Sequence, residues 1–561
     1  MAAQRRRVNR TAFRRTEPIS LRTPLALLLV SLGIIAGIWL WLARPVALPR
    51  APIDPAAKLE CVSYTPFRGD QTPLDPSLYV SADQIAHDLE QLAKITRCIR
   101  TYSVDVGLDQ VPTQAAKFGL KVIQGIWLGS DRYKNARQIE TAVALAKAHP
   151  DTIESLVVGN EVLLRGEMTS ADLVAAIRLV KSKVGNVPVT YADVWEFWLR
   201  YRDVYDAVDF VTIHILPYWE DFPVRAKYAA THVDSIRKRM AVAFPNKEIL
   251  IGETGWPSAG RMRAGALPSR TNQARVVSEI LDLARQEKFH VNLIEAYDQP
   301  WKEALEGTVG GYWGLYDSKA RALKYPPGQP ITDYPAWREQ MAGGIAFCLV
   351  IFGAALITLR RRPWSPRLSS WFVVALCATV GGTLAGMAVE KAMIESFGIA
   401  GWVRSVMLLI AAFGAPLLTA IAFMSGRHLP TFVEIVGPLD IRTTSRSQRF
   451  VGLVLIVLVI IAAETALGFV FDPRYRDFPF AALTMAVVPF FALMLFNKPQ
   501  QGTRPVAEMT FAGLFAICAI YILFNEGQNN WQSLWTCGMY LLLALTLSLA
   551  RVAQSPESAA R

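Results

Sequence analysis

Eight apolar runs, each long enough to cross a lipid bilayer, constrain this chain more than any other feature of its sequence. About 17 to 25 predominantly apolar residues span the hydrocarbon core as a helix. The chain is 52% hydrophobic and 19% charged, so it has more apolar surface than a soluble core would hide. The runs are residues 24–43, 342–359, 371–389, 405–424, 451–471, 478–497, 509–525 and 534–550. The sequence therefore predicts one N-terminal membrane anchor and an all-α bundle of seven C-terminal membrane helices.

The net charge of +12 lies beside these apolar runs and not in the long segment between them. Residues 1–23 carry seven Arg against one acidic residue, and residues 342–561 carry 16 Lys and Arg against ten acidic residues. Residues 24–341 carry 36 charges of each sign. Both termini are therefore predicted to be cytoplasmic, with the large central segment outside, because positive charge marks cytoplasmic loops. A neutral central segment also disfavours nucleic acid as a partner.

The predicted organisation has six parts. These are a cytoplasmic basic tail (1–23), an anchor (24–43), a linker (44–57), an exported domain (58–335), a membrane domain (342–550) and a cytoplasmic tail (551–561). The first apolar run is long for a signal peptide and lacks a clear small-x-small cleavage site, which favours an uncleaved anchor. Cys61 and Cys98 of the exported domain either form a disulfide or are two buried thiols. No metal or cofactor is predicted, since the His and Cys residues lack ligand spacing.

Short β-branched or apolar runs alternate with amphipathic helical stretches between residues 58 and 300, the pattern of repeated βα units. The predicted strands are residues 59–64, 98–102, 121–127, 153–158, 188–191, 210–213, 248–251 and 291–294. Ser81 and Thr169 precede helical stretches with a polar residue three positions later, as helix N-caps do. Eight such units predict an α/β fold, a closed (β/α)8 TIM barrel. Its active site should lie at the C-terminal ends of the strands.

Two glutamates follow predicted barrel strands directly. Glu161 ends the sequence VVGNE after the fourth strand, and Glu253 begins ETGWPS after the seventh. A carboxylate there is poorly solvated unless it faces the barrel mouth, and strands three apart in a ring of eight place the two opposite one another. Opposed carboxylates are what glycoside hydrolysis requires, one to protonate the leaving oxygen and one to attack or to activate water. The alternative, two salt-bridged residues at the rim, stays open.

Six strand-end motifs occur together in chain order: CVSYTPFRG, IRTYSVD, GNE, FVTIHILPYW, ETGWPS and IEAYDQPWK. In this set, over about residues 58–320, the chain resembles glycoside hydrolase family 17, the β-1,3-glucanases and β-1,3-glucan transglycosylases. The whole plan of anchor, barrel and bundle resembles bacterial membrane-bound members that make cyclic or branched β-glucans. The resemblance implies β-glucan donors and acceptors, a bacterial inner-membrane location with a periplasmic barrel, and no cofactor.

The resemblance also implies a retaining double displacement, with Glu161 as general acid/base and Glu253 as nucleophile. The two carboxyl groups should then lie roughly 5 to 5.5 Å apart, and ionised Glu253 should raise the pKa of Glu161. Asn160 is expected to bind the sugar 2-hydroxyl. An ion pair explains Glu295 and Lys302 nearly as well as a role in the site, and His214 is equally plausible as a core histidine. The complete set of predicted substrate-binding residues is Asn160, Tyr102, Tyr191, His214, Tyr218, Trp256, Glu295, Lys302 and Trp301. Four of these are expected either to orient Glu253 or to touch sugar: Tyr102, Tyr191, His214 and Tyr218.

The predicted function is a transglycosylase that remodels, branches or cyclises β-glucan outside the cytoplasmic membrane. Hydrolysis is the alternative, since both reactions use the same residues. A synthase using nucleotide sugars is disfavoured because the longest internal cytoplasmic loop, 425–450, has 26 residues. A glucan exporter or a synthase accessory subunit with a binding barrel is a remoter alternative, for which Glu464 is the clear ionisable residue within a span. The lipid bilayer and a separate membrane glucan synthase are the other predicted partners.

Overall fold

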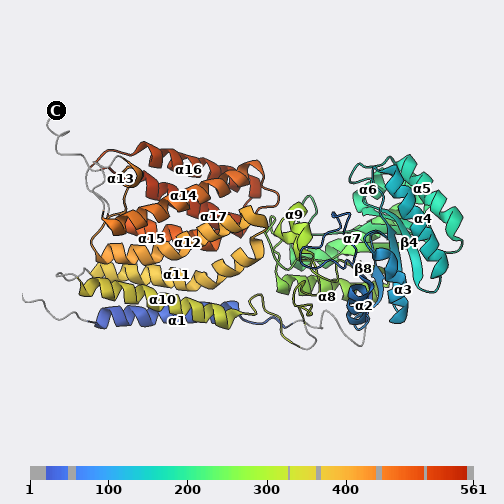
Figure 1. Ribbon diagram of the computed structural model, residues 1–561, viewed down its shortest axis with the longest axis horizontal. Coiled ribbons are helices and arrows are strands. Elements are labelled where there is room, and N and C mark those ends of the chain that lie inside the picture. The colour runs from blue at the N-terminus through green and yellow to red at the C-terminus, as the bar shows by residue number, and fades with distance from the viewer. Residues whose placement is uncertain are drawn as a thin grey trace, which may run out of the picture.

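In a computed structural model of the chain, the described residues are 21–47, 58–325, 329–361, 368–437, 445–497 and 502–552. They form a barrel and a helical bundle that lie end to end (Figure 1). Most of the predicted N-terminal tail, linker and C-terminal tail lies outside the described residues. So do several basic residues on which the predicted orientation rests, such as Arg362 and Arg442.

The barrel is closed and entirely parallel, with its eight strands in sequence order, as predicted. The strands are β1 (Leu59–Ser63), β2 (Thr96–Arg100), β3 (Lys121–Ile126), β4 (Ile153–Asn160), β5 (Val189–Val194), β6 (Val211–His214), β7 (Ile249–Thr254) and β8 (His290–Leu293). β4 and β7 run further than the apolar pattern predicts. Asn160 and Glu253 are therefore held within the sheet, which fixes their backbone positions.

Helices connect the strands and cover the barrel. They are α2 (Ala82–Leu92), α3 (Val111–Lys117), α4 (Arg132–Ala148), α5 (Ser170–Val184), α6 (Trp195–Arg200), α7 (Ala226–Ala243), α8 (Arg270–Glu287) and, after β8, α9 (Glu303–Glu306). The predicted caps are confirmed, since the Ser81 side chain accepts from the Gln84 N–H and that of Thr169 from the Asp172 N–H. Such caps satisfy backbone donors that lack a partner inside the helix.

A disulfide joins Cys61 to Cys98 across the neighbouring strands β1 and β2, where the two residues are register partners. This settles the alternative that the sequence left open. The described residues also include four unpaired, buried cysteines, all in the bundle: Cys348, Cys377, Cys518 and Cys537.

The bundle contains a helix at each of the eight predicted apolar runs. These are α1 (Arg22–Leu42), α10 (Trp337–Arg360), α11 (Leu368–Glu395), α12 (Gly398–Met424), α14 (Arg446–Phe471), α15 (Phe480–Phe496), α16 (Val506–Glu526) and α17 (Trp531–Ser548); the short α13 (Phe432–Val436) precedes α14. Among the described residues, six helices are long and apolar enough to cross a membrane. α15 is apolar but has 17 residues, and α17 opens with the buried polar residues Gln532, Ser533 and Thr536.

The N-terminal helix α1 is part of the bundle, because it packs against α10 and α11. Ile35 and Trp39 are its fully buried contacts. α10 and α11 approach closely at Gly344 and Gly382, where a Cβ on Gly344 would lie 2.0 Å from the Gly382 carbonyl oxygen. Small residues at such crossings are typical of helices that associate in lipid.

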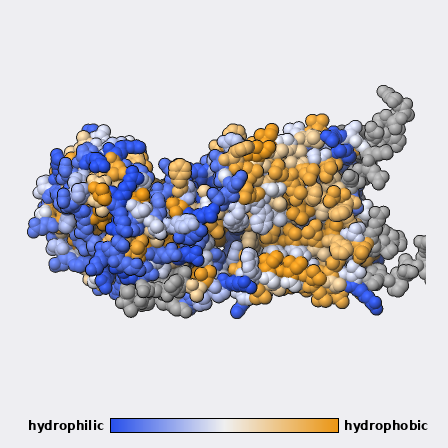
Figure 2. Space-filling view, turned by 180° about the vertical axis from the view of Figure 1, so that it is seen from behind, coloured by the Kyte–Doolittle hydropathy of each residue, from blue (hydrophilic) through white to orange (hydrophobic). Residues whose placement is uncertain are grey.

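On the face that Figure 2 shows, the surface of the bundle is mostly apolar, whereas that of the barrel is mostly polar. Leu29, Ile517 and Phe524 are among the bundle residues whose side chains are exposed. Contiguous exposed apolar surface of this extent marks a surface that water does not cover. The bundle is therefore suited to a lipid environment, in line with its six long apolar helices.

The barrel meets the bundle through loops that follow β6, β7 and β8. After β7, Arg261 forms a buried ion pair with Glu526, and the Met262 N–H donates to Gln532 Oε1 at 2.9 Å. After β8, the Thr308 hydroxyl donates to Asp477 Oδ2 at 2.7 Å. After β6, the rings of Trp219 and Tyr475 lie 6.2 Å apart. All of these loops leave the C-terminal ends of strands, so the C-terminal face of the barrel is turned toward the bundle (Figure 1).

We expect the disulfide to stabilise the barrel by about 2–4 kcal/mol, because it closes a loop between residues 37 positions apart and so restricts the unfolded chain. The double variant Cys61→Ser, Cys98→Ser should lower the melting temperature of the purified protein. Alkylation of the denatured, unreduced protein should modify the four bundle cysteines, and reduction should expose two more. Modification of all six before reduction would contradict the pairing.

Candidate active site

Glu253 lies in β7 at the barrel mouth, with its side chain 6% exposed. Its Oε1 accepts two hydrogen bonds, from the Tyr102 hydroxyl at 2.8 Å and from Arg100 Nη1 at 3.1 Å. The Arg100 side chain is 1% exposed, so its guanidinium compensates a carboxylate that burial would otherwise destabilise. No described residue donates a hydrogen bond to Oε2, which leaves that oxygen available to a ligand.

Glu161 follows β4 in a backbone conformation that residues with a Cβ rarely adopt, with φ at +52°. Its N–H donates to the Ala192 carbonyl at 2.8 Å, and its own carbonyl accepts from the Arg165 N–H at 2.9 Å. Left-handed residues of this kind persist only when their surroundings hold them, and they occur often at functional sites. The side chain is 24% exposed, so it is open to the barrel mouth.

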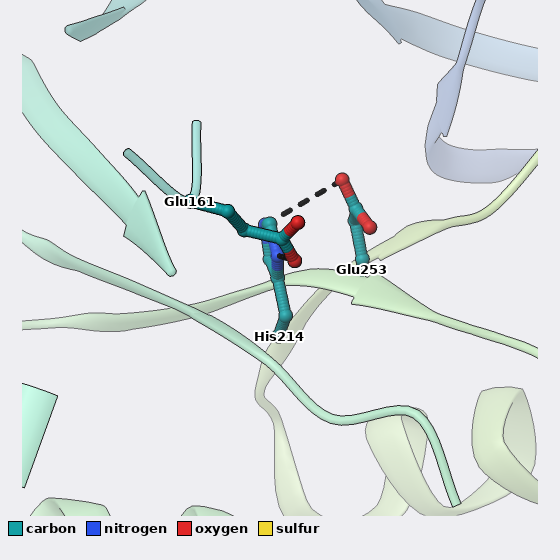
Figure 3. A group of neighbouring side chains, drawn as sticks. All are labelled: Glu161, His214 and Glu253. Atoms are coloured by element: carbon teal, nitrogen blue, oxygen red, sulfur yellow. Dashed lines mark hydrogen bonds and ion pairs between the residues drawn. The ribbon is translucent and has the colours of Figure 1, made fainter. Parts of the chain in front are cut away.

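His214, the last residue of β6, lies between the two glutamates (Figure 3). Its Nδ1 is 2.7 Å from Glu161 Oε1, and its Nε2 is 3.6 Å from Glu253 Oε1. Nε2 also lies 3.4 Å from Arg100 Nη1. Because a guanidinium can only donate, Nε2 faces it as an acceptor and Nδ1 carries the hydrogen that is donated to Glu161. His214 is therefore a fully buried side chain that orients Glu161, not an isolated core histidine.

The pKa of Glu161 is lowered, which corrects the expectation that it is raised. Burial raises the pKa, but the hydrogen bond from His214 and the positive charges of Arg165 and Arg100 outweigh burial. The expectation considered only the charge of Glu253. It omitted the histidine and the two arginines, which come from other parts of the sequence and favour the ionised carboxylate.

One ligand atom from each of Glu161, His214 and Glu253 lies within 4.8 Å of the others. Such a group could converge on a metal ion. However, Glu253 Oε1 already accepts from the Arg100 guanidinium, and a second cation beside it would be repelled. The donor set therefore fits two carboxylates organised by a guanidinium and an imidazole better than it fits a metal site.

Asn160 lies beside the two glutamates, and two arginines hold it there. Its side-chain Oδ1 accepts from Arg100 Nη2 at 2.5 Å, and its backbone carbonyl accepts from Arg165 Nη1. Arg165 also donates to the Leu128 carbonyl at 2.9 Å, and its guanidinium lies 4.3 Å from the ring centre of Trp127. Since Oδ1 is occupied by Arg100, the amide NH2 group is the part of Asn160 left for a ligand.

Glu295, just after β8, forms an ion pair with Lys302 at 2.7 Å and accepts from the Thr65 hydroxyl at 3.1 Å. Glu295 is fully buried, which raises its pKa, although the charge of Lys302 acts in the opposite direction. Trp301 is partly exposed, and its indole N–H donates to Gln299 Oε1 at 2.9 Å. This cluster lies close enough to the glutamates for the charge of Glu253 to act on Glu295.

The structure does not place Tyr191, Tyr218 and Trp256 as sugar contacts, which corrects these predictions. The Tyr191 hydroxyl donates to Asp193 and accepts from the Leu163 N–H at 3.1 Å. All three side chains are essentially unexposed. The Tyr218 hydroxyl donates to the Arg261 carbonyl at 2.9 Å, and the Trp256 indole donates to the Leu267 carbonyl at 3.1 Å. Burial leaves no ring face for a sugar, so these residues shape the loops around the site.

Arg100 is the main site residue that the sequence analysis missed. It donates to Glu253, to Asn160 and, at 2.8 Å, to the Gly252 carbonyl. A signal for it exists in the sequence, since an arginine at the end of an apolar strand must be paired when the strand is buried. Its partners could not be read from that signal, because they lie on β4 and β7.

These features define the class of the site: two carboxylates at the mouth of a (β/α)8 barrel, close enough for the double displacement of a retaining glycosidase. Comparisons with known proteins agree with this class. Residues 61–314 match the family model of the BtgE/BtgC glycoside hydrolase domain. A glucan 1,3-beta-glucosidase of Candida albicans is 28% identical over 261 residues, which cover 42% of this chain and 84% of that protein.

Two further similarities concern the same part of the chain. A probable family 17 glucosidase, SCW10, of Saccharomyces cerevisiae is 24% identical over 261 residues, covering 46% of this chain and 64% of that protein. The crystal structure of a family 17 β-1,3-glucanosyltransferase from Rhizomucor miehei is 24% identical and covers 47% of this chain and 95% of that one, with a TM-score of 0.42. Residues 61–314 are therefore the part of the chain that is similar to known glycoside hydrolase domains.

Replacing Arg100 by Lys should lower kcat/KM for glycosidic-bond cleavage by about 10- to 100-fold. The lysine ammonium keeps the charge but cannot donate to Glu253, Asn160 and Gly252 together, and a hydrogen bond to a charged group is worth about 1.5–3 kcal/mol. Steady-state kinetics with the purified full chain would measure this loss. Arg178→Lys, on the exposed side of α5, is the matched control. Equal kinetics for the two variants would contradict the role of Arg100.

Proposed function

We propose that this protein is a membrane-anchored, retaining enzyme that transfers segments of β-1,3-glucan to sugar acceptors. The observation that carries the proposal is the paired arrangement of Glu161 and Glu253, whose nearest ligand atoms lie within 4.8 Å. Retaining glycosidases need about 5–5.5 Å between their carboxyl groups, whereas inverting enzymes need about 6.5–9.5 Å to admit a water molecule. Relatives of this domain carry the names of enzymes of 1,3-β-glucan, which supports the choice of substrate.

In the first step of the proposed mechanism, Glu253 Oε2 attacks the anomeric carbon while Glu161 gives a proton to the leaving oxygen. The bond to the leaving sugar breaks, and a glycosyl-enzyme ester forms on Glu253. Tyr102 and Arg100 hold Oε1 of Glu253 at 2.8 and 3.1 Å, which aims the other oxygen at the substrate. In the second step, Glu161 takes a proton from an acceptor hydroxyl, and that oxygen displaces Glu253.

The lowered pKa of Glu161 favours the second step over the first at neutral pH. A carboxylate that is already ionised accepts the proton of an incoming hydroxyl, whereas the first step needs the protonated acid. The 2.7 Å hydrogen bond from His214 Nδ1 to Glu161 Oε1 stabilises the ionised form of Glu161. The free enzyme should therefore react best on the acidic side of neutrality.

Hydrolysis uses the same residues and differs only in the acceptor. It is the second candidate, because curated relatives of this domain are named as glucosidases. Transfer is preferred here because the catalytic face of the barrel is turned toward the bundle, where loops after three strands contact it. An acceptor sugar held in that space competes with water for the glycosyl-enzyme.

We also propose that the bundle lies in a bacterial inner membrane and that the barrel is periplasmic. The positive-inside pattern of the sequence supports this orientation, and the six long apolar helices support the bilayer as the environment. The Cys61–Cys98 disulfide fits an oxidising compartment. A membrane glucan synthase is the proposed protein partner, and no metal or cofactor is required by this mechanism.

Incubating the full chain with laminari-oligosaccharides should give products longer than the donor, because a sugar hydroxyl resolves the glycosyl-enzyme. Separation of the products by mass spectrometry would measure this. Glu253→Gln should lower the rate by at least about 10³-fold, since the nucleophile is lost. Only shorter products would indicate a glucanase, and full activity of the Glu253→Gln variant would contradict the mechanism itself.

His214→Gln should move the alkaline limb of the pH profile of kcat/KM to higher pH. That limb reports the pKa of the general acid in the free enzyme. Loss of His214 removes a cause that lowers the pKa of Glu161 and leaves burial, which raises it. The proton is then retained to higher pH. His232→Gln, which alters a hydrogen bond with Glu220 in the same domain, is the control. An unchanged limb in the His214 variant would contradict the assignment.

A further inference from the structure

A cavity of about 390 Å³ lies between the barrel and the bundle. The barrel contributes the segment of α9 and the residues that follow it, including Glu303, Ala304 and Thr308. The bundle contributes the barrel-facing ends of α11, α12 and α14 and the loop before α15. Glu161 and Glu253 are not among the lining residues, so the cavity is separate from the carboxylate pair.

The cavity has a charged rim and an apolar floor. Among the lining residues, Arg404 is partly exposed and Asp472 is exposed, whereas Leu408 and Phe469, about one turn away along the chain, are buried. Thr465 also lines the cavity and lies seven positions before Asp472, about 10 Å along the axis of the helix. The space therefore extends into the bundle and offers both polar groups and apolar walls, a combination typical of small-ligand sites.

The cations of the rim already have partners. Lys391 pairs with Glu395 on α11, and Arg404 and Arg476 lie 3.5 and 3.4 Å from Glu464. An anionic ligand such as a phosphate would find no unpaired cation among these residues and would face nearby carboxylates. The charge pattern therefore disfavours an anion.

One carboxylate oxygen of Asp477, a residue that lines the cavity, has no hydrogen-bond donor among the described residues. The Oδ2 atom of Asp477 accepts from the Thr308 hydroxyl at 2.7 Å, but its Oδ1 atom is buried with no hydrogen-bond partner among the described residues. Burying such an acceptor is costly unless a ligand or water donates to it. On the opposite wall, burial raises the pKa of Glu303 to about 8, with a smaller contribution from Asp477. At neutral pH Glu303 is therefore protonated and can donate.

The same short segment connects the cavity to the active site. Lys302 pairs with Glu295 beside the carboxylates, and the next residues, Glu303 and Ala304, line the cavity. Glu306, at the end of α9, is near enough to Glu161 and Glu253 for their charges to act on it. About one helical turn of chain thus borders both the active site and the cavity.

We propose that this junction cavity is a second carbohydrate site, which binds the part of an uncharged glucan chain that extends beyond the barrel. Hydroxyl groups can donate to Asp477 and accept from Glu303, and the sugar C–H faces can pack on the apolar wall. The identity of the sugar rests on the proposed function. The site is composed of residues from both bodies, so the bundle takes part in substrate binding.

The test uses the full chain in detergent or nanodiscs, in a Glu253→Gln background that prevents turnover. Ala304→Trp fills the cavity from the barrel side and Ala400→Trp from the bundle side. The matched controls are the neighbouring, exposed positions Leu305→Trp and Ile399→Trp, which do not line the cavity. Calorimetric titration compares laminaritriose with a long laminari-oligosaccharide.

We expect both cavity variants to weaken binding of the long oligosaccharide by about tenfold, equivalent to about 1.4 kcal/mol, with no change for laminaritriose or in the controls. Unchanged affinity for the long chain in both variants would overturn the proposal, even with normal laminaritriose binding. Loss of a co-purifying lipid in the cavity variants, without any effect on glucan affinity, would assign the cavity to lipid instead. Failure of the parent chain to bind or cleave laminaritriose would overturn the proposed function, and this inference with it.

Discussion

The arrangement of the active site depends on one buried cation, Arg100. Two carboxylates and an imidazole lie within 4.8 Å of one another at the barrel mouth, and like charges so close repel strongly where water is scarce. The Arg100 guanidinium donates to Glu253 on β7, to Asn160 on β4 and to the Gly252 carbonyl. Arg100 therefore compensates the negative charge of Glu253 and also fixes the distance between Glu253 and Asn160. A lysine could not do both with a single ammonium group.

His214 gives different environments to the two glutamates that Arg100 brings together. It donates to Glu161 and lies farther from Glu253, so the environments of the two carboxylates differ although their chemistry is the same. Pairs of titratable groups whose surroundings differ are how one barrel separates an acid/base from a nucleophile. Here the difference favours an ionised Glu161, which suits the second step of the proposed mechanism, in which an acceptor hydroxyl loses its proton. The positive φ of Glu161 belongs to the same arrangement, because it turns the side chain from the end of β4 into the barrel mouth.

The barrel and both glutamates could be predicted because each depends on local pattern: alternating βα units, and acidic residues directly after apolar strands. The partners of Arg100 and His214 and the direction of the Glu161 pKa depend on contacts between β2, β4, β6 and β7, which no local pattern encodes. Trp256 shows the opposite error. Its place in a strand-end motif predicts a sugar contact, but its indole is buried and its N–H donates to the Leu267 carbonyl.

In the bundle, the sequence predicts an apolar run at 371–389, yet α11 continues to Glu395. Polar residues at the end of a helix can form hydrogen bonds and ion pairs with neighbouring elements, so the helix extends beyond the apolar run.

That extension of α11 matters because it brings Lys391 and Glu395 to the junction with the barrel. A bundle that served only as an anchor would need no charged helix ends beneath the catalytic face, and burying them carries a desolvation cost. Here the charged ends pair with one another and surround a cavity that the barrel completes through Glu303 and Thr308. The buried Arg261–Glu526 pair holds the two bodies in one orientation. In the proposed transfer reaction, a chain that enters or leaves the catalytic face on this side therefore passes along the bundle, which is then part of the environment in which the acceptor competes with water.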